Sequence, residues 1–242
     1  MSLPLQTLVF IRRTSVTFAC VFWLGLLASV ACAKDTYSID RSAELSTLLA
    51  PPPALNSEIQ KTELAELHQW QQTRTAEMVA YAQADQKINV FRFADILGAQ
   101  FTSANLPLTD ALFVKAINTS ELLTKEAKKF FNRPRPFVSD TSLKPTLDHP
   151  PNASYPSGHS TGGNLFAILL ANMIPEKSAE IFARGQAFAQ NRVIGGVHYP
   201  SDIAAGRICA TIVADRLFAN PDFQKDFAAA KAELRRQLGL KP

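Results

Sequence analysis

Cysteine is scarce in this chain of 242 residues, which contains three. Cys20 and Cys32 lie in an N-terminal segment that we expect to be removed, so the mature chain keeps only Cys209. A single cysteine cannot form an internal disulfide, and the Ile-Cys-Ala context of Cys209 predicts a small, buried apolar side chain. The mature fold is therefore not expected to depend on disulfides.

The chain also lacks a strong charge of either sign. Its formal net charge is +4, from 25 basic and 21 acidic residues. Removal of residues 1–33 takes away Arg12 and Arg13 and no acid, which leaves 23 basic against 21 acidic residues, a net charge of +2. So small an excess predicts neither nucleic acid nor an anionic membrane surface as a partner.

Long apolar runs and alternating strand patterns are both missing after residue 33. The two most apolar stretches are 165–174, which is too short to span a bilayer, and 203–219, which Arg207 and Asp215 interrupt. We therefore expect no stable membrane insertion of the mature chain. The absence of strand patterns predicts an all-α fold.

The N-terminal segment has the three parts of a secretory signal. Arg12 and Arg13 precede an uncharged apolar stretch over 16–30, and Ala31-Cys32-Ala33 gives the small-x-small pattern of a cleavage site. We expect removal near Ala33 and a periplasmic or secreted mature protein. A membrane anchor, a lipoprotein modified at Cys32 and a twin-arginine signal are the alternatives, each with a poorer fit to these residues.

The mature chain divides into a proline-rich lead-in over 34–56 and a helical domain over 57–242. The lead-in is expected to be extended and ends near Pro51-Pro52-Pro53. Helix-favouring composition and the positions of proline then predict a series of helices within this domain. The helices are expected at 57–84, 95–100, 109–131, 160–173, 177–190, 203–218 and 221–238, with Thr109-Asp110 as an N-cap.

Three short segments concentrate the unusual residues, and the first is basic. It runs from Lys128 to Pro136 and contains two Arg-Pro pairs, at Arg133 and Arg135. Lys128 and Arg135 are seven apart, so two helical turns would place both cations on one face, whereas the residue seven before Arg133 is Glu126. We therefore favour Arg135 as the partner of Lys128 at an anion, against a simple basic helix end.

The second segment, Tyr155 to Gly163, is a turn of small residues that leads into a helix. Such a turn leaves backbone N–H groups free to bind an anion. Ser157 adds a hydroxyl, Gly158 allows close approach of a ligand to the backbone, and His159 can exchange a proton. The alternative is an ordinary N-capped helix with a surface histidine.

The third segment, Asn191 to Asp202, contains Arg192, His198 and Asp202. Pro200 suits the first turn of a helix and places Asp202 back toward His198. A carboxylate that accepts from one ring nitrogen leaves the other as a nucleophile. The alternative is a helix-capping aspartate with an incidental histidine. Together the three segments supply cations, N–H donors, two histidines and an orienting carboxylate, which is the set of groups that phosphoryl transfer requires.

The order Lys-x6-Arg-Pro, Pro-Ser-Gly-His and Arg-x5-His-x3-Asp resembles the type 2 phosphatidic acid phosphatase superfamily, which also contains vanadium-dependent haloperoxidases. Within it, the chain is most similar to the class A bacterial non-specific acid phosphatases. The similarity also includes 48–53 (Leu-Leu-Ala-Pro-Pro-Pro), 154–160, 192–194 and 220–223, and runs from about Leu48 to the C-terminus.

The resemblance implies an all-α, compact single-domain helical bundle of the acid phosphatase and vanadium haloperoxidase type. It also implies a metal-independent phosphatase for small phosphorylated substrates, with no cofactor, that usually self-associates as a homo-oligomer. It implies that His198 attacks phosphorus, Asp202 orients His198, and His159 protonates the leaving alcohol and then activates water. The phosphate-binding residues that it implies are Lys128, Arg135, Ser157, Gly158 and Arg192. One residue departs from the family pattern: Asn191 stands where Ser is usual, which can alter local geometry.

Other prominent residues are expected to be structural. We expect His68 to be a solvent-facing helical residue, His149 a loop residue, and Tyr155 to pack beneath the anion site. Five phenylalanines are expected in the core: Phe130, Phe131, Phe166, Phe182 and Phe188.

Three alternative functions fit parts of the pattern. A lipid phosphatase acting on phosphatidate or an isoprenyl pyrophosphate would differ in its substrate rates, and a vanadium haloperoxidase would oxidise halide when loaded with vanadate. A non-catalytic phosphate-binding protein would need the cations and N–H donors but not the His198 and Asp202 pair.

Overall fold

The computed structural model describes residues 36–241, and the expected signal segment lies outside them. All regular structure in this part of the chain is helical, which confirms the all-α prediction. The elements are α1 (Leu45–Leu48), α2 (Glu58–Thr73), α3 (Ala76–Ala84), η1 (Val90–Phe93), α4 (Ala94–Leu97), α5 (Pro107–Phe131), α6 (Pro136–Ser139), α7 (Gly158–Met173), η2 (Pro175–Lys177), α8 (Ser178–Ile194), α9 (Pro200–Phe218) and α10 (Pro221–Gln237). No helix within residues 36–241 is both long and apolar enough to cross a bilayer.

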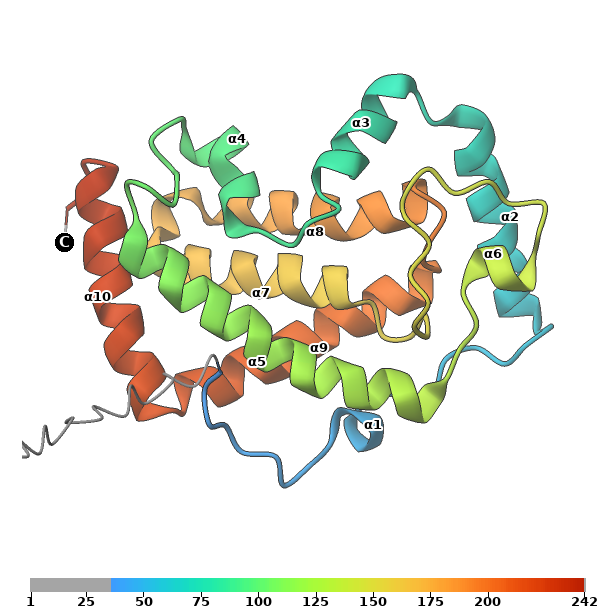
Figure 1. Ribbon diagram of the computed structural model, residues 1–242, viewed down its shortest axis with the longest axis horizontal. Helices are drawn as coiled ribbons and strands as arrows, with labels where there is room; N and C mark the ends of the chain where they lie inside the picture. The colour runs from blue at the N-terminus through green and yellow to red at the C-terminus, as the bar shows by residue number, and fades with distance from the viewer. Residues whose placement is uncertain (1–35, 242) are drawn as a thin grey trace, which may run out of the picture. The chain divides into compact units, whose positions relative to one another are not determined.

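The central helix is α7, which packs against α8 and α9 along its length and against α5 (Figure 1). Glycine permits the closest approach of α7 to α8. A Cβ on Gly185 would lie 2.7 Å from the Cβ of Ala167, and one on Gly163 would lie 2.8 Å from the Cβ of Phe188. Because real Cβ atoms do not approach so closely, these two glycines set the spacing of the helix pair.

The ends of four helices meet at one end of the bundle, on the right in Figure 1. α5 and α8 finish there, whereas α7 and α9 begin there. Lys128 and Arg192 lie in the last turns of α5 and α8, where the helix dipole favours cations. The N-terminus of α7 offers unpaired N–H groups to an anion at the same end.

The lead-in is more ordered than an extended arm. Leu45 begins the short helix α1, and the side chains of Tyr37, Leu45 and Leu49 are buried in the main core. The backbone N–H of Tyr37 also donates to Thr119 Oγ1 on α5 (2.8 Å). The apolar residues of this segment therefore join it to the helical domain.

The helix predicted over 57–84 is wrong as a single element, because the chain breaks between α2 and α3. Arg74 adopts an extended backbone conformation, and the side chain of Thr75 accepts from Met78 N as the cap of α3. The Arg74 guanidinium donates to the carbonyls of Ile194 (2.9 Å) and Lys144. Two carbonyls that are distant in the sequence therefore stabilise the break between α2 and α3. The local composition does not indicate this break.

Two smaller predictions also fail. The helix expected at 95–100 lies earlier, as η1 and α4, and Gly98 with φ of 95° ends it. Of the five phenylalanines expected in the core, Phe166 and Phe188 are fully buried, but Phe130 and Phe182 are 68% and 45% exposed. Phe130 packs edge-on against its neighbour Phe131, which is half-buried.

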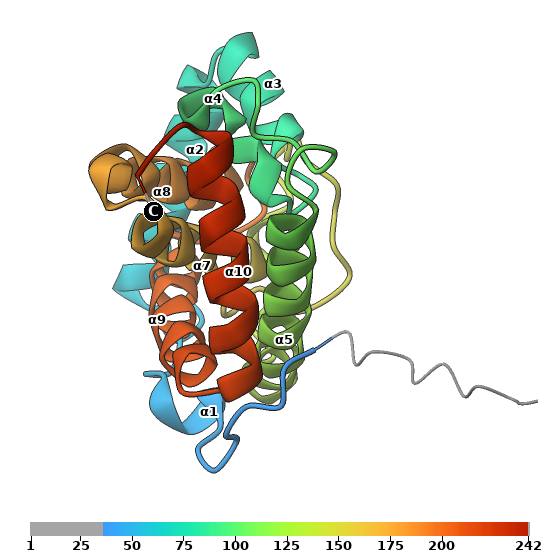
Figure 2. The same cartoon turned by 90° about the vertical axis from the view of Figure 1, so that its left-hand side faces the viewer.

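The predicted N-cap at Thr109-Asp110 is wrong, because α5 begins at Pro107 and its free N–H groups are bound from α10. The carboxylate of Glu233 accepts from Leu108 N (3.1 Å), Thr109 N (2.8 Å) and Thr109 Oγ1 (2.8 Å). α5 and α10 lie side by side over this contact (Figure 2). An anion at this position also satisfies the helix dipole.

Replacement of Glu233 should therefore destabilise the fold. We expect Glu233→Ala to lower the free energy of unfolding by about 2–3 kcal/mol, because buried donors at the start of α5 lose their acceptor. The exposed Glu180→Ala on α8 is the matched control and should change it by less than about 0.5 kcal/mol. Urea denaturation measures both, and equal losses would contradict the capping role.

Candidate active site

A cavity of about 350 Å³ lies where the four helix ends meet. Six of the eight site residues predicted from the sequence line it: Lys128, Arg135, Gly158, His159, Arg192 and His198. The other two, Ser157 and Asp202, are fully buried beside it. A larger groove of about 470 Å³ between α7, α8 and α9 is lined by none of these eight residues.

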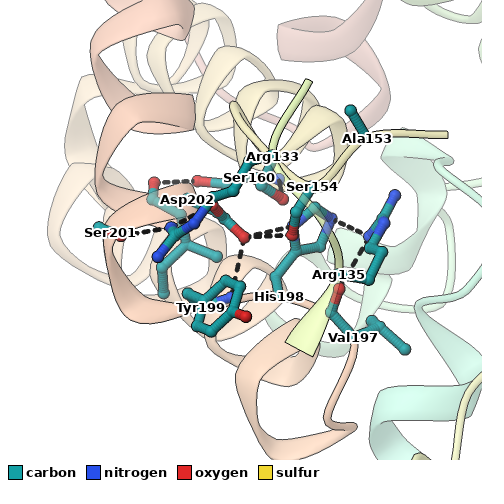
Figure 3. Close-up of polar contacts among 12 residues, drawn as sticks. Arg133, Arg135, Ala153, Ser154, Ser160, Val197, His198, Tyr199, Ser201 and Asp202 are labelled. Carbon is teal, nitrogen blue, oxygen red and sulfur yellow. Dashed lines mark hydrogen bonds and ion pairs between the residues drawn. The ribbon is translucent and has the colours of Figure 1, made fainter. Parts of the chain in front are cut away.

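His198 is held in one tautomer by contacts on both sides of its ring (Figure 3). Its Nδ1 lies 3.1 Å from Asp202 Oδ2, and its Nε2 lies 2.8 Å from Arg135 Nη1. A guanidinium only donates, so Nε2 accepts and the ring proton lies on Nδ1, directed at the carboxylate. His198 therefore presents a nitrogen lone pair at the cavity, and burial followed by the charge of Arg135 lowers its pKa well below the usual value.

Asp202 is enclosed by donors, although it is fully buried. It accepts from Arg133 Nη1 at Oδ1 (2.7 Å) and from Ser154 Oγ and Tyr199 N at Oδ2 (2.5 and 2.9 Å). Burial raises the pKa of the carboxyl, while Arg133 and these hydrogen bonds oppose the rise. Arg133 also pairs with Glu63 (2.7 Å), so it lies behind the site and not in the cavity.

Sequence reasoning set Arg133 aside and did not find Glu63 or Ser154. The two Arg-Pro pairs look alike in the sequence, but Arg133 points toward Asp202 and Arg135 points toward His198. Glu63 lies 70 residues before Arg133, on α2. A serine directly before the Tyr-Pro-Ser-Gly-His run was the one signal available for Ser154.

Lys128 and Arg135 approach the same cavity, but not by helical spacing. α5 ends at Phe131, and Asn132 turns the chain with φ of 44°, so Arg135 comes from the start of α6. Arg135 donates to Asn152 O (3.0 Å), Asn152 Oδ1 (2.6 Å) and Val197 O (2.8 Å). The prediction of one helical face was wrong, although the two cations do line one cavity.

The cations of the cavity have no carboxylate partner within the described chain. Lys128 Nζ donates to Ala153 O (2.7 Å) and Ser154 O (3.2 Å), and burial followed by the nearby Arg135 lowers its pKa to about 7. Arg192 is 1% exposed, yet its Nε and Nη1 have no hydrogen-bond partner among residues 36–241. Its pKa falls to about 10, because of burial and then the charge of Arg135. Buried unpaired donors of this kind indicate a site for an anion.

The start of α7 forms the floor of the cavity. Ser157 is its N-cap, and the hydroxyl accepts from Ser160 N (3.3 Å). Gly158 lines the cavity, and a Cβ placed on it would meet no atom within 4 Å, so the space above the backbone is open. The first N–H groups of α7 therefore face a volume that an anion can fill.

His159 is fixed at the cavity wall by two contacts. Its Nε2 lies 2.8 Å from Gln86 O, and its ring stacks on Phe188 with centroids 6.3 Å apart. Because a carbonyl only accepts, Nε2 bears a proton and Nδ1 is the nitrogen that can exchange one. Burial, followed by the charge of Arg192, lowers the pKa of His159 to about 3.

The remaining histidines and Asn191 lie outside the cavity lining. His68 Nε2 contacts Asp140 Oδ2 (2.8 Å), and His149 stacks on Phe137. Tyr155 is buried and donates to Ala50 O (2.6 Å). Asn191 turns away from the cavity and donates to Asp85 Oδ2 (2.8 Å), so its larger side chain is accommodated on the far side of α8.

The chain belongs to the PAP2 superfamily, whose model matches residues 108–224 and so includes all eight predicted site residues. An acid phosphatase of Zymomonas mobilis is 31% identical over 238 residues, which cover 90% of each chain. A non-specific acid phosphatase of Providencia stuartii is 31% identical over 215 residues, which cover 84% of this chain and 87% of its own. A crystal structure of a bacterial vanadium-dependent iodoperoxidase shares the fold with a TM-score of 0.53 at 20% identity, over 69% of this chain and 52% of its own.

Arg192 provides a direct test of the anion site. Inorganic phosphate at 100 times its Kd should raise the free energy of unfolding of the wild type by about 2.7 kcal/mol. In Arg192→Met we expect phosphate to bind at least about tenfold more weakly, because a charged donor pair is lost. The ligand-free variant should be no less stable than the wild type, because a buried uncompensated charge has been removed.

Urea unfolding with and without phosphate measures both effects. Arg236→Met, at an exposed position on α10, is the control and should leave the stabilisation by phosphate unchanged. Equal stabilisation of Arg192→Met and the wild type would show that Arg192 does not contact the anion.

Proposed function

We propose that the protein is an exported acid phosphatase that hydrolyses phosphate monoesters through a covalent phosphohistidine on His198. The observation that supports this most is the fixed tautomer of His198. Its unprotonated nitrogen, Nε2, accepts from Arg135 at a cavity where the buried cations Lys128, Arg135 and Arg192 have no carboxylate partner in the described chain. A protein that only binds phosphate needs the cations but has no use for an oriented nucleophile. The relatives named acid phosphatases along most of the chain support the same class of reaction.

In the first step His198 Nε2 attacks phosphorus, and the bond from phosphorus to the leaving oxygen breaks. The electron pair stays on that oxygen, which takes a proton from His159 Nδ1. Attack requires the contact between Nε2 and Arg135 to open, so that the guanidinium can turn to the phosphate. Asp202 stabilises the ring proton and the positive charge that His198 gains.

In the second step water attacks the phosphohistidine and gives its proton to His159 Nδ1. The P–N bond breaks, and its electron pair returns to Nε2. Lys128, Arg135, Arg192, the Ser157 hydroxyl and the Gly158 N–H bind the equatorial oxygens through both steps. Lys128 and Arg192 already line the cavity in the ligand-free protein, so the main rearrangement needed to stabilise the transition state is the turn of the Arg135 guanidinium.

Export and broad substrate use rest on separate observations. Export rests on the expected signal segment over residues 1–33, with a periplasmic or secreted destination. Broad substrate use rests on the relative named a non-specific acid phosphatase, and on a cavity wall where Ile88 and Pro150 offer apolar surface beside polar side chains such as Thr124. Self-association and metal independence remain predictions from the resemblance.

Removal of the nucleophile should abolish the reaction. We expect His198→Ala to lose at least about 10³-fold in kcat with p-nitrophenyl phosphate, and Asp202→Asn to lose about 10²–10⁴-fold because the tautomer is no longer fixed. Rapid alkaline quenching of wild type with ³²P-labelled substrate should trap an acid-labile, base-stable adduct that His198→Ala lacks. Full activity of His198→Ala, or a trapped adduct on another residue, would contradict the proposal.

Anion affinity should fall as pH rises, because Lys128 has a pKa of about 7 in the ligand-free protein. Sulfate is a suitable probe, since its charge is constant from about pH 5 to about pH 9. We expect its Kd to rise roughly tenfold per pH unit above 7 in the wild type, while Arg135 and Arg192, with pKa values of about 10, stay charged.

The matched variant is Lys128→Arg, which should keep sulfate affinity constant to about pH 9. Calorimetric titration measures both proteins. The same pH dependence in Lys128→Arg would show that another group titrates.

A further inference from the structure

A buried carboxylate that the proposed reaction does not use lies next to the His159 wall of the cavity. Asp85 is fully buried at the end of α3 and receives four hydrogen bonds. Its Oδ1 accepts from Arg92 Nε (2.8 Å) and Arg184 Nη2 (2.6 Å), and its Oδ2 accepts from Arg184 Nη1 (3.0 Å) and Asn191 Nδ2 (2.8 Å). All of its lone-pair directions are thereby used, so the position of Asp85 is strongly fixed.

Asp85 precedes, in the sequence, the residue whose carbonyl contacts the acid–base histidine. The next residue, Gln86, places its carbonyl oxygen 2.8 Å from His159 Nε2. On the other side of the cluster, Asn191 immediately precedes Arg192, whose unpaired guanidinium lines the cavity. The cluster therefore joins the backbone that holds His159 to the helix turn that holds Arg192.

We propose that Asp85 and Asn191 are positioning residues for His159, acting through the Gln86 carbonyl. This inference rests on the proposed function, in which His159 Nδ1 gives a proton to the leaving oxygen. With Gln86 O fixed, Nε2 retains its proton in both charge states of the ring, and only Nδ1 gains and loses one. A displaced carbonyl would release the ring to rotate or to adopt the other tautomer, and proton donation would lose its direction.

The positive charges around His159 make the fixed Gln86 carbonyl necessary as an acceptor for its ring proton. Arg192 on α8, Arg135 from the start of α6 and Lys128 on α5 all oppose protonation of the ring, as does its burial. His198, from the segment before α9, also faces this group of cations. The Gln86 carbonyl is the contact that favours the protonated form, and a bound phosphate would add the negative charge that makes His159 an acid.

The test uses the dependence of the rate on the leaving group. p-Nitrophenolate leaves without much help from an acid, whereas ethoxide needs a proton. We expect His159→Ala to lower kcat/KM for ethyl phosphate by about 10²-fold or more beyond its effect on p-nitrophenyl phosphate. Asp85→Asn and Asn191→Ala should show the same selectivity at about tenfold, because they displace the acid without removing it.

The matched control is Asp95→Asn, which removes a salt bridge to the same Arg184 (2.8 Å) but does not touch Asp85 or Gln86. It should change thermal stability without changing the ratio of the two kcat/KM values. Asn191→Ala keeps the test valid if Asp85→Asn does not fold, because it leaves both arginine pairs of Asp85 in place.

Three outcomes decide the matter. Selective loss on ethyl phosphate in Asn191→Ala, and not in Asp95→Asn, supports the positioning role. Equal loss on both substrates in Asn191→Ala, with a selective loss in His159→Ala, overturns the positioning role and leaves the proposed function intact. No selectivity in His159→Ala overturns the acid role of His159, and the positioning role with it.

Discussion

The site depends on holding several buried positive charges close together without a protein carboxylate among them. Burial lowers the pKa values of Lys128, Arg135 and Arg192, and the charge of Arg135 lowers those of Lys128 and Arg192 further. The pKa of Lys128 is about 7 in the folded protein, against an ordinary value of 10.5, so the unfolded chain binds more protons between these values. Stability of the ligand-free protein therefore rises with pH over this interval, and the cost of the charged site is greatest on the acid side. A bound phosphate offsets that cost under the conditions in which an acid phosphatase works.

The carboxylates behind His198 do not line the cavity, whose lining includes Glu121 as its one carboxylate among the described residues. Asp202 reaches the site only through the ring of His198, and its second oxygen is bound by Arg133. Arg133 also donates to the carboxylate of Glu63, so Arg133 compensates the negative charge that lies behind His198. Because Asp202 does not line the cavity, it can orient His198 without neutralising the cations that we propose bind substrate. The arginines of the two similar Arg-Pro pairs therefore have different contacts. Arg133 binds the carboxylate of Asp202, whereas Arg135 faces the cavity.

How far the sequence predicts this arrangement depends on how many residues separate the partners of each interaction along the chain. The start of α7, the proline that opens α9 and the buried Cys209 follow from neighbouring residues, and the structure agrees with each. The three motifs also gave six of the residues that line the cavity, since their order is specific even where the helical-face reasoning for Arg135 failed. The break held by Arg74 and the cap supplied by Glu233 join residues more than a hundred positions apart. The local composition around both features is ordinary, so the break at Arg74 and the cap from Glu233 become visible only in the folded structure.

Asn191 illustrates how a residue beside a motif can matter without contacting substrate. Successive residues on an α-helix point about 100° apart, so Asn191 faces Asp85 while Arg192 faces the cavity. The last turn of α8 therefore belongs to two networks, one that we propose fixes the Gln86 carbonyl and one that we propose binds the anion. A side chain too short to reach Asp85 would leave Oδ2 with Arg184 alone, and the link between α8 and the end of α3 would weaken. Geometry at His159 would then change although every phosphate-binding side chain was still present. For this reason the effect of position 191 should appear in proton transfer before it appears in phosphate affinity.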